Sequence, residues 1–149
     1  MKATTLLEHQ HRNLEELCET VERGSASMRV SLLPQLAGDL QALMAVEEEL
    51  FYPAACAALH DQAPLAFCRE HREEARRSLL RTLEAAPDGE EFERAIGELR
   101  NLVARHAHEE KGELFPRLEK ALDAAAMRRL GTEMLAMYDL EVESGYPAA

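Results

Sequence analysis

Four segments of this chain repeat apolar residues at spacings of three or four, and histidine or glutamate interrupts each repeat. Such spacings place residues on one face of an α-helix, and helices that pack together bury that face. The pattern therefore predicts packed helices with ionisable side chains in their common core. The four stripes are Leu7, His11, Leu14, Cys18 and Val21; Leu36, Leu40, Leu43, Glu47, Leu50 and Ala54; Phe67, His71, Ala75, Leu79 and Leu83; and Phe92, Ile96, Leu99, Val103, His106, Glu110 and Leu114.

The composition supports an all-helical fold, because Leu, Ala, Glu and Arg dominate while β-branched and aromatic residues are sparse. Turn signals predict helices at about residues 5–23, 32–59, 62–86, 88–122 and 123–139, followed by a frayed tail at 143–149. Long helices with short connections predict an antiparallel up-down four-helix bundle over about residues 4–122, with a short additional C-terminal helix. The 149 residues are expected to form a single domain.

The predicted helix starts rest on capping residues. Ser31 precedes the second helix, which places Pro34 in its first turn. The other capping candidates are Thr5, in a T-x-x-E box with Glu8; Asp61, before the third helix; and Asp88, paired with Glu91.

Two segments echo each other: EEELFYP at 47–53 and EEKGELFP at 109–116. In both, a pair of glutamates precedes an aromatic-proline step. Pro53 and Pro116 fall inside predicted helices, where proline lacks a backbone N–H and clashes with the preceding turn. We therefore expect both helices to bend or break locally.

Charge and hydropathy exclude several functions. With 28 acidic and 17 basic residues the net charge is −11, which argues against binding nucleic acid or an anionic membrane surface. No apolar run approaches the roughly 20 residues needed to span a membrane, and the first residues lack a signal-peptide core, so a cytoplasmic location is expected.

The three cysteines, Cys18, Cys56 and Cys68, are widely spaced along the chain. They are expected to be buried apolar residues rather than partners in a disulfide or ligands of a zinc ion.

Five metal-capable side chains fall on the core-facing stripes: His11, Glu47, His71, His106 and Glu110. Burying an unpaired carboxylate is costly unless the group becomes neutral. A metal cation removes the difficulty, because it supplies positive charge and accepts lone pairs from all five. Imidazole and carboxylate without thiolate suit iron or manganese better than structural zinc. Glu47 and Glu110 are the candidate bridges between two ions.

Each of these residues also has a metal-free interpretation. A lone histidine on an apolar face is commonly a hydrogen-bonded core residue, and His106 with Glu110 could form an i, i+4 pair. Glu47 would face solvent if its register were one residue off. The combination across four helices favours a metal. The other histidines, His9, His60 and His108, are expected to be non-ligands, and the methionines are expected to pack in the core.

From Leu6 to about Leu122 the chain resembles the hemerythrin-like, or HHE cation-binding, family. The segments that carry the resemblance are LLEHQHRNLEEL, REHREEARRSLL and HAHEEKGELFPRL. The last segment is the most specific of the three, because its spacing from histidine to proline also matches the family pattern. The resemblance implies metal ligation by His11, His71 and His106, with Glu110 as a bridge.

One position departs from the family pattern. Counting back from Pro53, Glu47 occupies the family's glutamate position, but Leu43 stands where a histidine is usual. This removes one ligand, from the metal that also uses His11. Three outcomes are open: a second metal with fewer protein ligands; completion by Glu48, Tyr52 or His9; or retention of only the metal served by His71 and His106. Ala75 replaces a further histidine of the oxygen-carrying branch, which argues against oxygen carriage.

The resemblance implies a non-haem iron protein with one or two ions, which binds or senses O2, NO or peroxide, or handles iron. Its expected partner is a small diatomic or peroxide ligand. Two alternatives stay open: a di-iron oxidase or peroxidase at the same site, and a degenerate, metal-free helical interaction module.

Overall fold

The computed structural model describes residues 1–145, which contain helices and turns and no strand. The predicted all-helical fold is confirmed. None of the helices in this part of the chain has the length and apolar character required to cross a membrane. The helices are α1 (Ala3–Arg23), α2 (Ala26–Val46), α3 (Tyr52–Leu59), α4 (Ala63–Glu84), α5 (Glu90–Glu109), α6 (Phe115–Ala121) and α7 (Ala124–Gly145), with π-helical turns η1 (Glu47–Phe51) and η2 (Glu110–Leu114).

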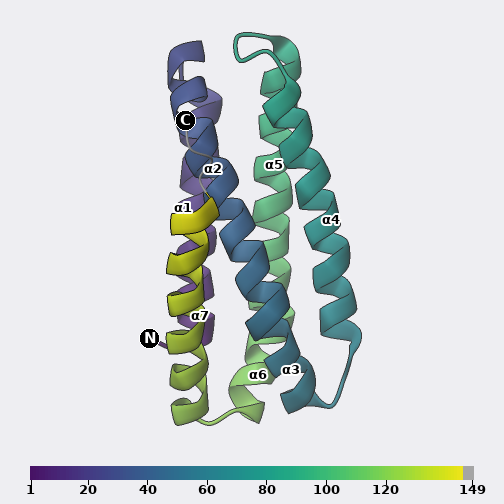
Figure 1. The fold of residues 1–149 in the computed structure, drawn as a ribbon. Coiled ribbons are helices and arrows are strands. Elements are labelled where there is room, and N and C mark those ends of the chain that lie inside the picture. Colours follow the sequence, from purple (N-terminus) through teal and green to yellow (C-terminus); the bar gives the residue numbers. More distant parts are fainter. Residues whose placement is uncertain (146–149) are drawn as a thin grey trace.

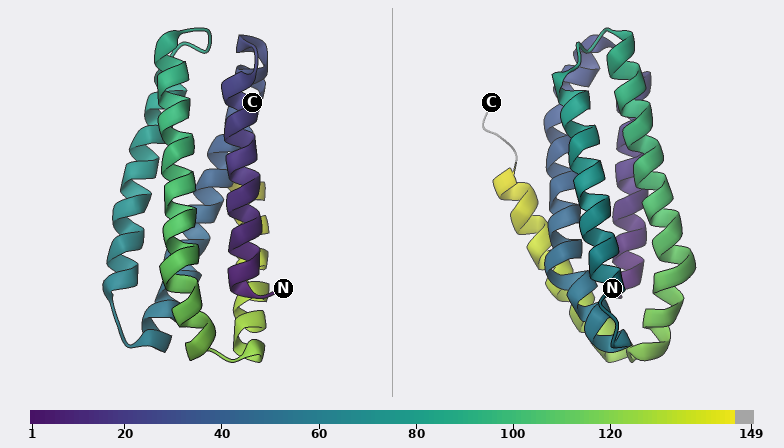
Figure 2. Two further views of the ribbon diagram at one scale, coloured as in Figure 1. Left: turned by 180° about the vertical axis from the view of Figure 1, so that it is seen from behind. Right: turned by 90° about the vertical axis from the view of Figure 1, so that its right-hand side faces the viewer.

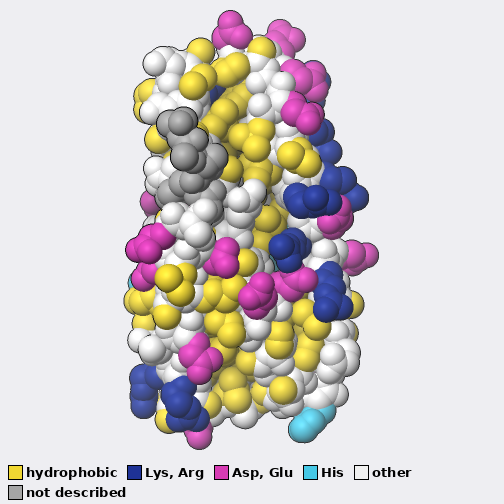
Figure 3. All heavy atoms as spheres, viewed as in Figure 1, with side chains coloured by type: hydrophobic (Ala, Val, Ile, Leu, Met, Phe, Trp, Pro, Cys, Tyr) yellow, Lys and Arg dark blue, Asp and Glu magenta, His cyan; other side chains and the backbone are white. Residues whose placement is uncertain are grey.

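The long helices stand side by side (Figures 1 and 2). Helix α2 continues through η1 into α3, and α5 continues through η2 into α6. Helix α1 packs against α2 and α5, α4 packs mainly on α5, and α7 packs on α1 and α2. Helices α4 and α7 therefore lie on opposite sides of the molecule (Figure 1). Figure 3 shows the molecule in space-filling form from the same side as Figure 1, with apolar side chains exposed among the charged ones.

The start of α1 differs from the prediction. The helix begins two residues before Thr5, so the capping box of Thr5 and Glu8 does not form. Instead, the Thr4 hydroxyl donates a hydrogen bond of 2.6 Å to Glu119 in α6, and Lys2 Nζ lies 3.3 Å from the same carboxylate. These long-range contacts fix the start of the helix, which local sequence does not reveal.

Helix α2 also begins earlier than predicted. It starts directly after Ser25, whose hydroxyl oxygen accepts a hydrogen bond from the Met28 amide at 3.2 Å. The predicted start after Ser31 is therefore wrong, and Pro34 lies inside the helix rather than in its first turn. Both serines can cap a helix, and the one that follows Gly24 does so here.

The remaining boundaries are mixed. Asp61 accepts a hydrogen bond from the Ala63 amide at the start of α4, as its capping role predicted, although Gln62 is the N-cap. Asp88 does not cap α5: the N-cap is Gly89 without a side-chain bond, and acidic residues of the first turn face the helix dipole instead. Helix α7 is longer than predicted, reaching Gly145. The predicted frayed tail thus begins inside α7, and its residues 146–149 lie outside the described residues.

Two of the predicted stripes hold along their helices and two do not. The stripes of α1 and α5 are buried throughout. In α4, Ala75 and Leu79 are buried as predicted, but the two ends of the stripe are not: Phe67 and Leu83 are 37% and 41% exposed. This outer helix packs mainly on α5, and it buries the neighbouring residues Cys68 and Thr82 instead. After Glu47 the stripe moves from Leu50 to Phe51, because a π turn adds one residue to the turn.

Gly131 of α7 lies directly against the backbone at the start of α1. A Cβ at this position would lie 2.1 Å from the Met1 carbonyl oxygen and 2.9 Å from the Ala3 amide nitrogen. Gly131→Ala is therefore expected to lower the free energy of unfolding by about 1–3 kcal/mol, measured by urea denaturation.

Gly112→Ala is the matched control, because a Cβ there would meet nothing within 4 Å. It is expected to raise the free energy of unfolding by up to about 1 kcal/mol, since alanine restricts the unfolded chain. Equal effects of the two substitutions would contradict the close approach of α7 to α1.

Candidate metal centre

Four buried side chains from four elements converge in the core: His11 of α1, Glu47 of η1, His106 of α5 and Glu110 of η2. His106 Nε2 lies 2.9 Å from Glu47 Oε2 and 3.0 Å from Glu110 Oε2. His11 Nε2 lies 3.4 Å from Glu110 Oε1 and 3.8 Å from Glu47 Oε1. One ligand atom from each residue lies within 4.8 Å of all the others, so the group can surround a metal ion.

Both glutamates occupy the first position of a π turn. The Tyr52 amide bonds to the carbonyl of Glu47, and the Phe115 amide bonds to the carbonyl of Glu110, each across five residues. A proline follows each glutamate six residues later, and its missing N–H and ring disfavour regular helix just before it. The local break predicted at both prolines is therefore a π turn, a feature common at functional sites.

The two carboxylates compete for one proton. Burial raises the pKa of Glu110 to about 7, and the charge of Glu47 beside it acts in the same direction. Burial would also raise the pKa of Glu47, but the positive charge of His106 and several hydrogen bonds hold it well below its usual range. For His106, burial is outweighed by the two glutamates, and its pKa rises to about 10. Without a metal, protons on His106 and Glu110 offset the negative charge of the two glutamates, and a bound metal ion could replace these protons.

The donor set fits a metal better than it fits hydrogen bonding alone. His11 Nε2 and Glu110 Oε1 are buried and have no hydrogen-bond partner, although they face each other. Metal bonds to nitrogen and oxygen are about 2.0–2.2 Å long, so two ligands of one ion stand about 3–4 Å apart. The nitrogen-to-oxygen distances of 2.9–3.8 Å match this spacing. An ion between these atoms would satisfy both unpartnered groups.

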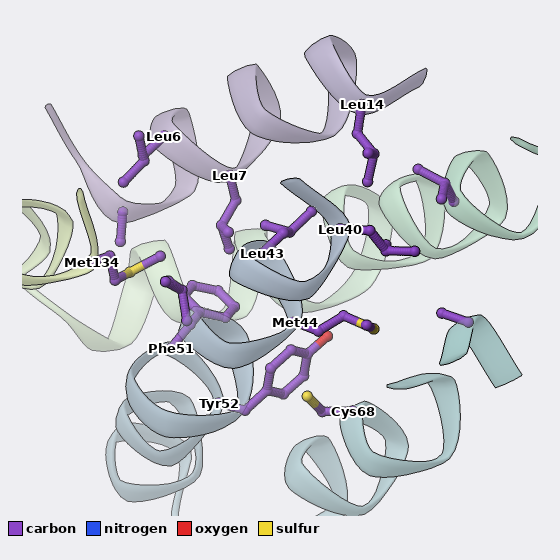
Figure 4. Close-up of a cluster of buried hydrophobic side chains, with 14 of the residues drawn as sticks. Leu6, Leu7, Leu14, Leu40, Leu43, Met44, Phe51, Tyr52, Cys68 and Met134 are labelled. Atoms are coloured by element: carbon purple, nitrogen blue, oxygen red, sulfur yellow. The ribbon is translucent and has the colours of Figure 1, made fainter. Parts of the chain in front are cut away.

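Tyr52 is an additional buried contact of the centre. Its hydroxyl donates a hydrogen bond to Glu110 Oε2. Burial and the charges of Glu110 and Glu47 raise the pKa of the phenol, so it stays protonated. Figure 4 shows the Tyr52 side chain next to Cys68, whose thiol pKa is also raised by burial. All three cysteines are buried and free, as expected.

His71 lies beside the four-residue group rather than within it. Its half-buried ring stacks on the ring of His106, with 3.5 Å between centroids and 6° between planes. Burial and the charge of His106 lower the pKa of His71 to about 3, so its imidazole is neutral at physiological pH. A neutral imidazole has the free lone pair that a metal ligand requires. Phe67 stacks on His106 as well, 5.6 Å between centroids.

Leu43 lies one helical turn before Glu47, as His106 lies one turn before Glu110. It is 3% exposed and belongs to the main apolar cluster together with Leu7 and Leu40 (Figure 4). The α2 side of the centre is therefore apolar where the α5 side is polar. This asymmetry follows directly from the sequence.

Of the three residues considered as substitutes for the missing histidine, Tyr52 alone contacts the centre. Glu48 is held by arginines of α4: it forms an ion pair with Arg72, and Arg69 Nε lies 3.7 Å from its carboxylate. His9 is exposed, as are His60 and His108. The contact between Tyr52 and Glu110 connects the two echoing segments, and only their proximity in the fold reveals it.

Two cavities reach the centre from different sides. One of about 390 Å³ is lined by Tyr52 and Glu110, and the other, of about 300 Å³, is lined by His11. The first lies against α4, and the second lies between α1 and the α5–η2 segment. Both sides of the buried group therefore adjoin open space.

Comparisons with known proteins agree with this geometry. Residues 2–118 match the family profile described as hemerythrin HHE cation binding domain. No curated protein matches the chain. The fold is similar to the crystal structure of a hemerythrin HHE cation binding domain-containing protein, the Rv2633c homolog from Mycobacterium kansasii, with a TM-score of 0.84, 20% identity and coverage of 97% of this chain and 89% of that one. The profile match spans most of the sequence, so the chain belongs to the hemerythrin HHE cation-binding domain family.

Proposed function

We propose that this protein binds non-haem iron in its core, with His11, Glu47, His106 and Glu110 as ligands and His71 as a further ligand beside His106. The proposal rests on the buried group of four convergent side chains. Two of its potential metal-binding atoms, His11 Nε2 and Glu110 Oε1, have no hydrogen-bond partner. The frame we propose is the antiparallel up-down bundle of α1, α2, α4 and α5, with α7 as the additional helix; their contacts support it.

Ligand chemistry supports iron and unequal positions for two ions. Imidazole and carboxylate ligands without thiolate suit iron, and carboxylates can bridge two ions. One position would have His71 and His106 with both glutamates. The other would have only His11 with the same glutamates, because Leu43 supplies no donor. We therefore propose one firmly held ion and a second, weaker position completed by water.

Bound iron would act as a redox-active Lewis acid to which a small ligand could bind. We propose that its ligand is O2, NO or peroxide, or that the protein handles iron itself. A peroxidase or oxidase activity is the second candidate, favoured by Tyr52, which holds a phenolic proton at Glu110. If that activity exists, Tyr52→Phe is expected to reduce peroxide consumption without changing iron content.

The test is elemental analysis of untagged protein together with its visible absorption spectrum. About one or two irons per chain, with bands typical of iron–oxygen bonding, would support the proposal. Absence of metal after anaerobic addition of ferrous iron would refute it and favour a helical interaction module.

Iron affinity is expected to rise with pH between 7 and 9. With a pKa of about 10, His106 carries a proton in this range, and that proton must leave when a metal binds. Each proton displaced makes the apparent affinity rise about tenfold per pH unit. Competition with a chelator of known pH dependence measures this slope. Below pH 7 affinity falls further, because Glu110 also takes up a proton. An affinity independent of pH would contradict the proton balance at the centre.

A further inference from the structure

The larger of the two cavities connects carboxylates near the surface with a buried, proposed ligand residue. It has a volume of about 390 Å³ and is lined at its inner end by Tyr52 and Glu110. Glu110 is 1% exposed, and its Oε1 has no hydrogen-bond partner. The cavity has room for a cation with its first shell of about six waters, at about 30 Å³ per water.

The outer part of this cavity is acidic. Asp61, Glu109 and Glu113 line it, and Arg117 is the one basic lining residue. Arg117 lies 3.6 Å from Asp61 Oδ2, so its charge is matched there. Glu109 and Glu113 form no ion pair within residues 1–145, and they stand one helical turn apart beside Glu110. Their uncompensated charge attracts cations and raises their local concentration.

The second cavity provides an internal comparison, because it reaches the same centre at His11 without a net acidic lining. Glu8 and Glu15 are matched there by Arg12 and Lys111. The charge contrast between the two cavities is therefore not a general result of the chain's net charge of −11. It is local to the side of Glu110.

We propose that the cavity over Glu110 is the route by which a hydrated divalent metal ion reaches the centre, with Glu109 and Glu113 as its outer carboxylates. This inference rests on the proposed metal-binding function. Carboxylates such as those of Glu109 and Glu113 exchange with the waters of a hard cation, and the buried carboxylate of Glu110, which lines the inner end of the cavity, is the next acceptor inward. Phe67 and Leu114 contribute apolar walls, and most of the charged side chains that line the path are carboxylates.

The test is the rate at which metal-free protein takes up ferrous iron without oxygen. Free iron is measured with a chromophoric chelator after timed quenching, at low and high ionic strength. The double variant Glu109→Gln/Glu113→Gln is expected to load about tenfold more slowly than wild type at low salt, with a weaker salt dependence. Its final iron content is expected to equal that of wild type, because neither residue is a ligand.

The matched control is Glu8→Gln/Glu15→Gln, which removes the same two negative charges at the other cavity. It is expected to load at nearly the wild-type rate. Equal slowing of both double variants, or no slowing of either, would overturn the route while leaving metal binding intact. If the cavity admits only a small neutral ligand and no cation, neither double variant should slow the uptake of iron. Failure of wild type to bind iron at all would refute the proposed function, and the route with it.

Discussion

Replacing Glu110 by glutamine is expected to abolish the stabilisation that iron gives to the folded chain, while the metal-free variant remains at least as stable as wild type at pH 8. Glutamine keeps an oxygen to accept the Tyr52 hydrogen bond but is a poor metal ligand. The pKa of Glu110 is raised to about 7, so above that pH its charge opposes folding, and glutamine removes this cost.

Urea denaturation with and without ferrous iron, under anaerobic conditions, measures both effects. Iron at 100 times its dissociation constant is expected to stabilise wild type by about 2.7 kcal/mol, and the variant is expected to show little of this. Glu98→Gln is the control, since Glu98 lies on α5 with an exposed side chain, and its carboxylate is 3.8 Å from Arg81. Iron-dependent stabilisation that survives Glu110→Gln would contradict the proposed ligand set.

Replacing Leu43 by histidine is expected to strengthen the weaker metal position sharply. The new imidazole would stand one turn before Glu47, in the relation that His106 has to Glu110. A lost ligand costs more than the ~10–100-fold loss in affinity typical of outer-shell partners, so the second equivalent of iron should bind at least about tenfold more tightly in the variant. Anaerobic titration of iron measures the two equivalents.

Without metal, Leu43→His should destabilise the chain by about 1–3 kcal/mol, because it buries an unpaired polar group. Leu40→His is the matched control: Leu40 is 2% exposed and precedes Leu43 by one turn. It should be destabilised similarly, but iron should restore only the Leu43 variant. Iron binding that is unchanged in Leu43→His would show that Leu43 does not limit the second position.

Sequence periodicity predicted the parts of the fold in which a regular helix runs unbroken against the core. In α1 and α5, apolar neighbours one turn away fix the direction of His11 and His106, so the convergence of these residues could be predicted. Periodicity assumes a constant number of residues per turn, and the π turn after Glu47 changes that number. The stripe therefore moved from Leu50 to Phe51.

Other features depend on which helices meet, and the sequence does not contain that information in readable form. The stacking of His71 on His106 depends on how α4 is rotated about its own axis. That rotation is set by packing, mainly against α5. The early start of α1 depends on a contact with Glu119, over 100 positions away. The position of the cavities depends on the same tertiary contacts.

The two π turns place the least regular backbone of two helices at the level of the ligands. Each is followed by a proline that donates no hydrogen bond, so α3 and α6 are joined to the longer helices by incomplete ladders. These short helices contact each other, and they can therefore open together at a smaller cost in hydrogen bonds than any long helix. Amide hydrogen exchange should be fastest there among the buried segments. Because Glu47 and Glu110, the proposed ligands, lie at the edge of this opening unit, we expect the release of a bound ion to require local unfolding rather than global unfolding of the chain.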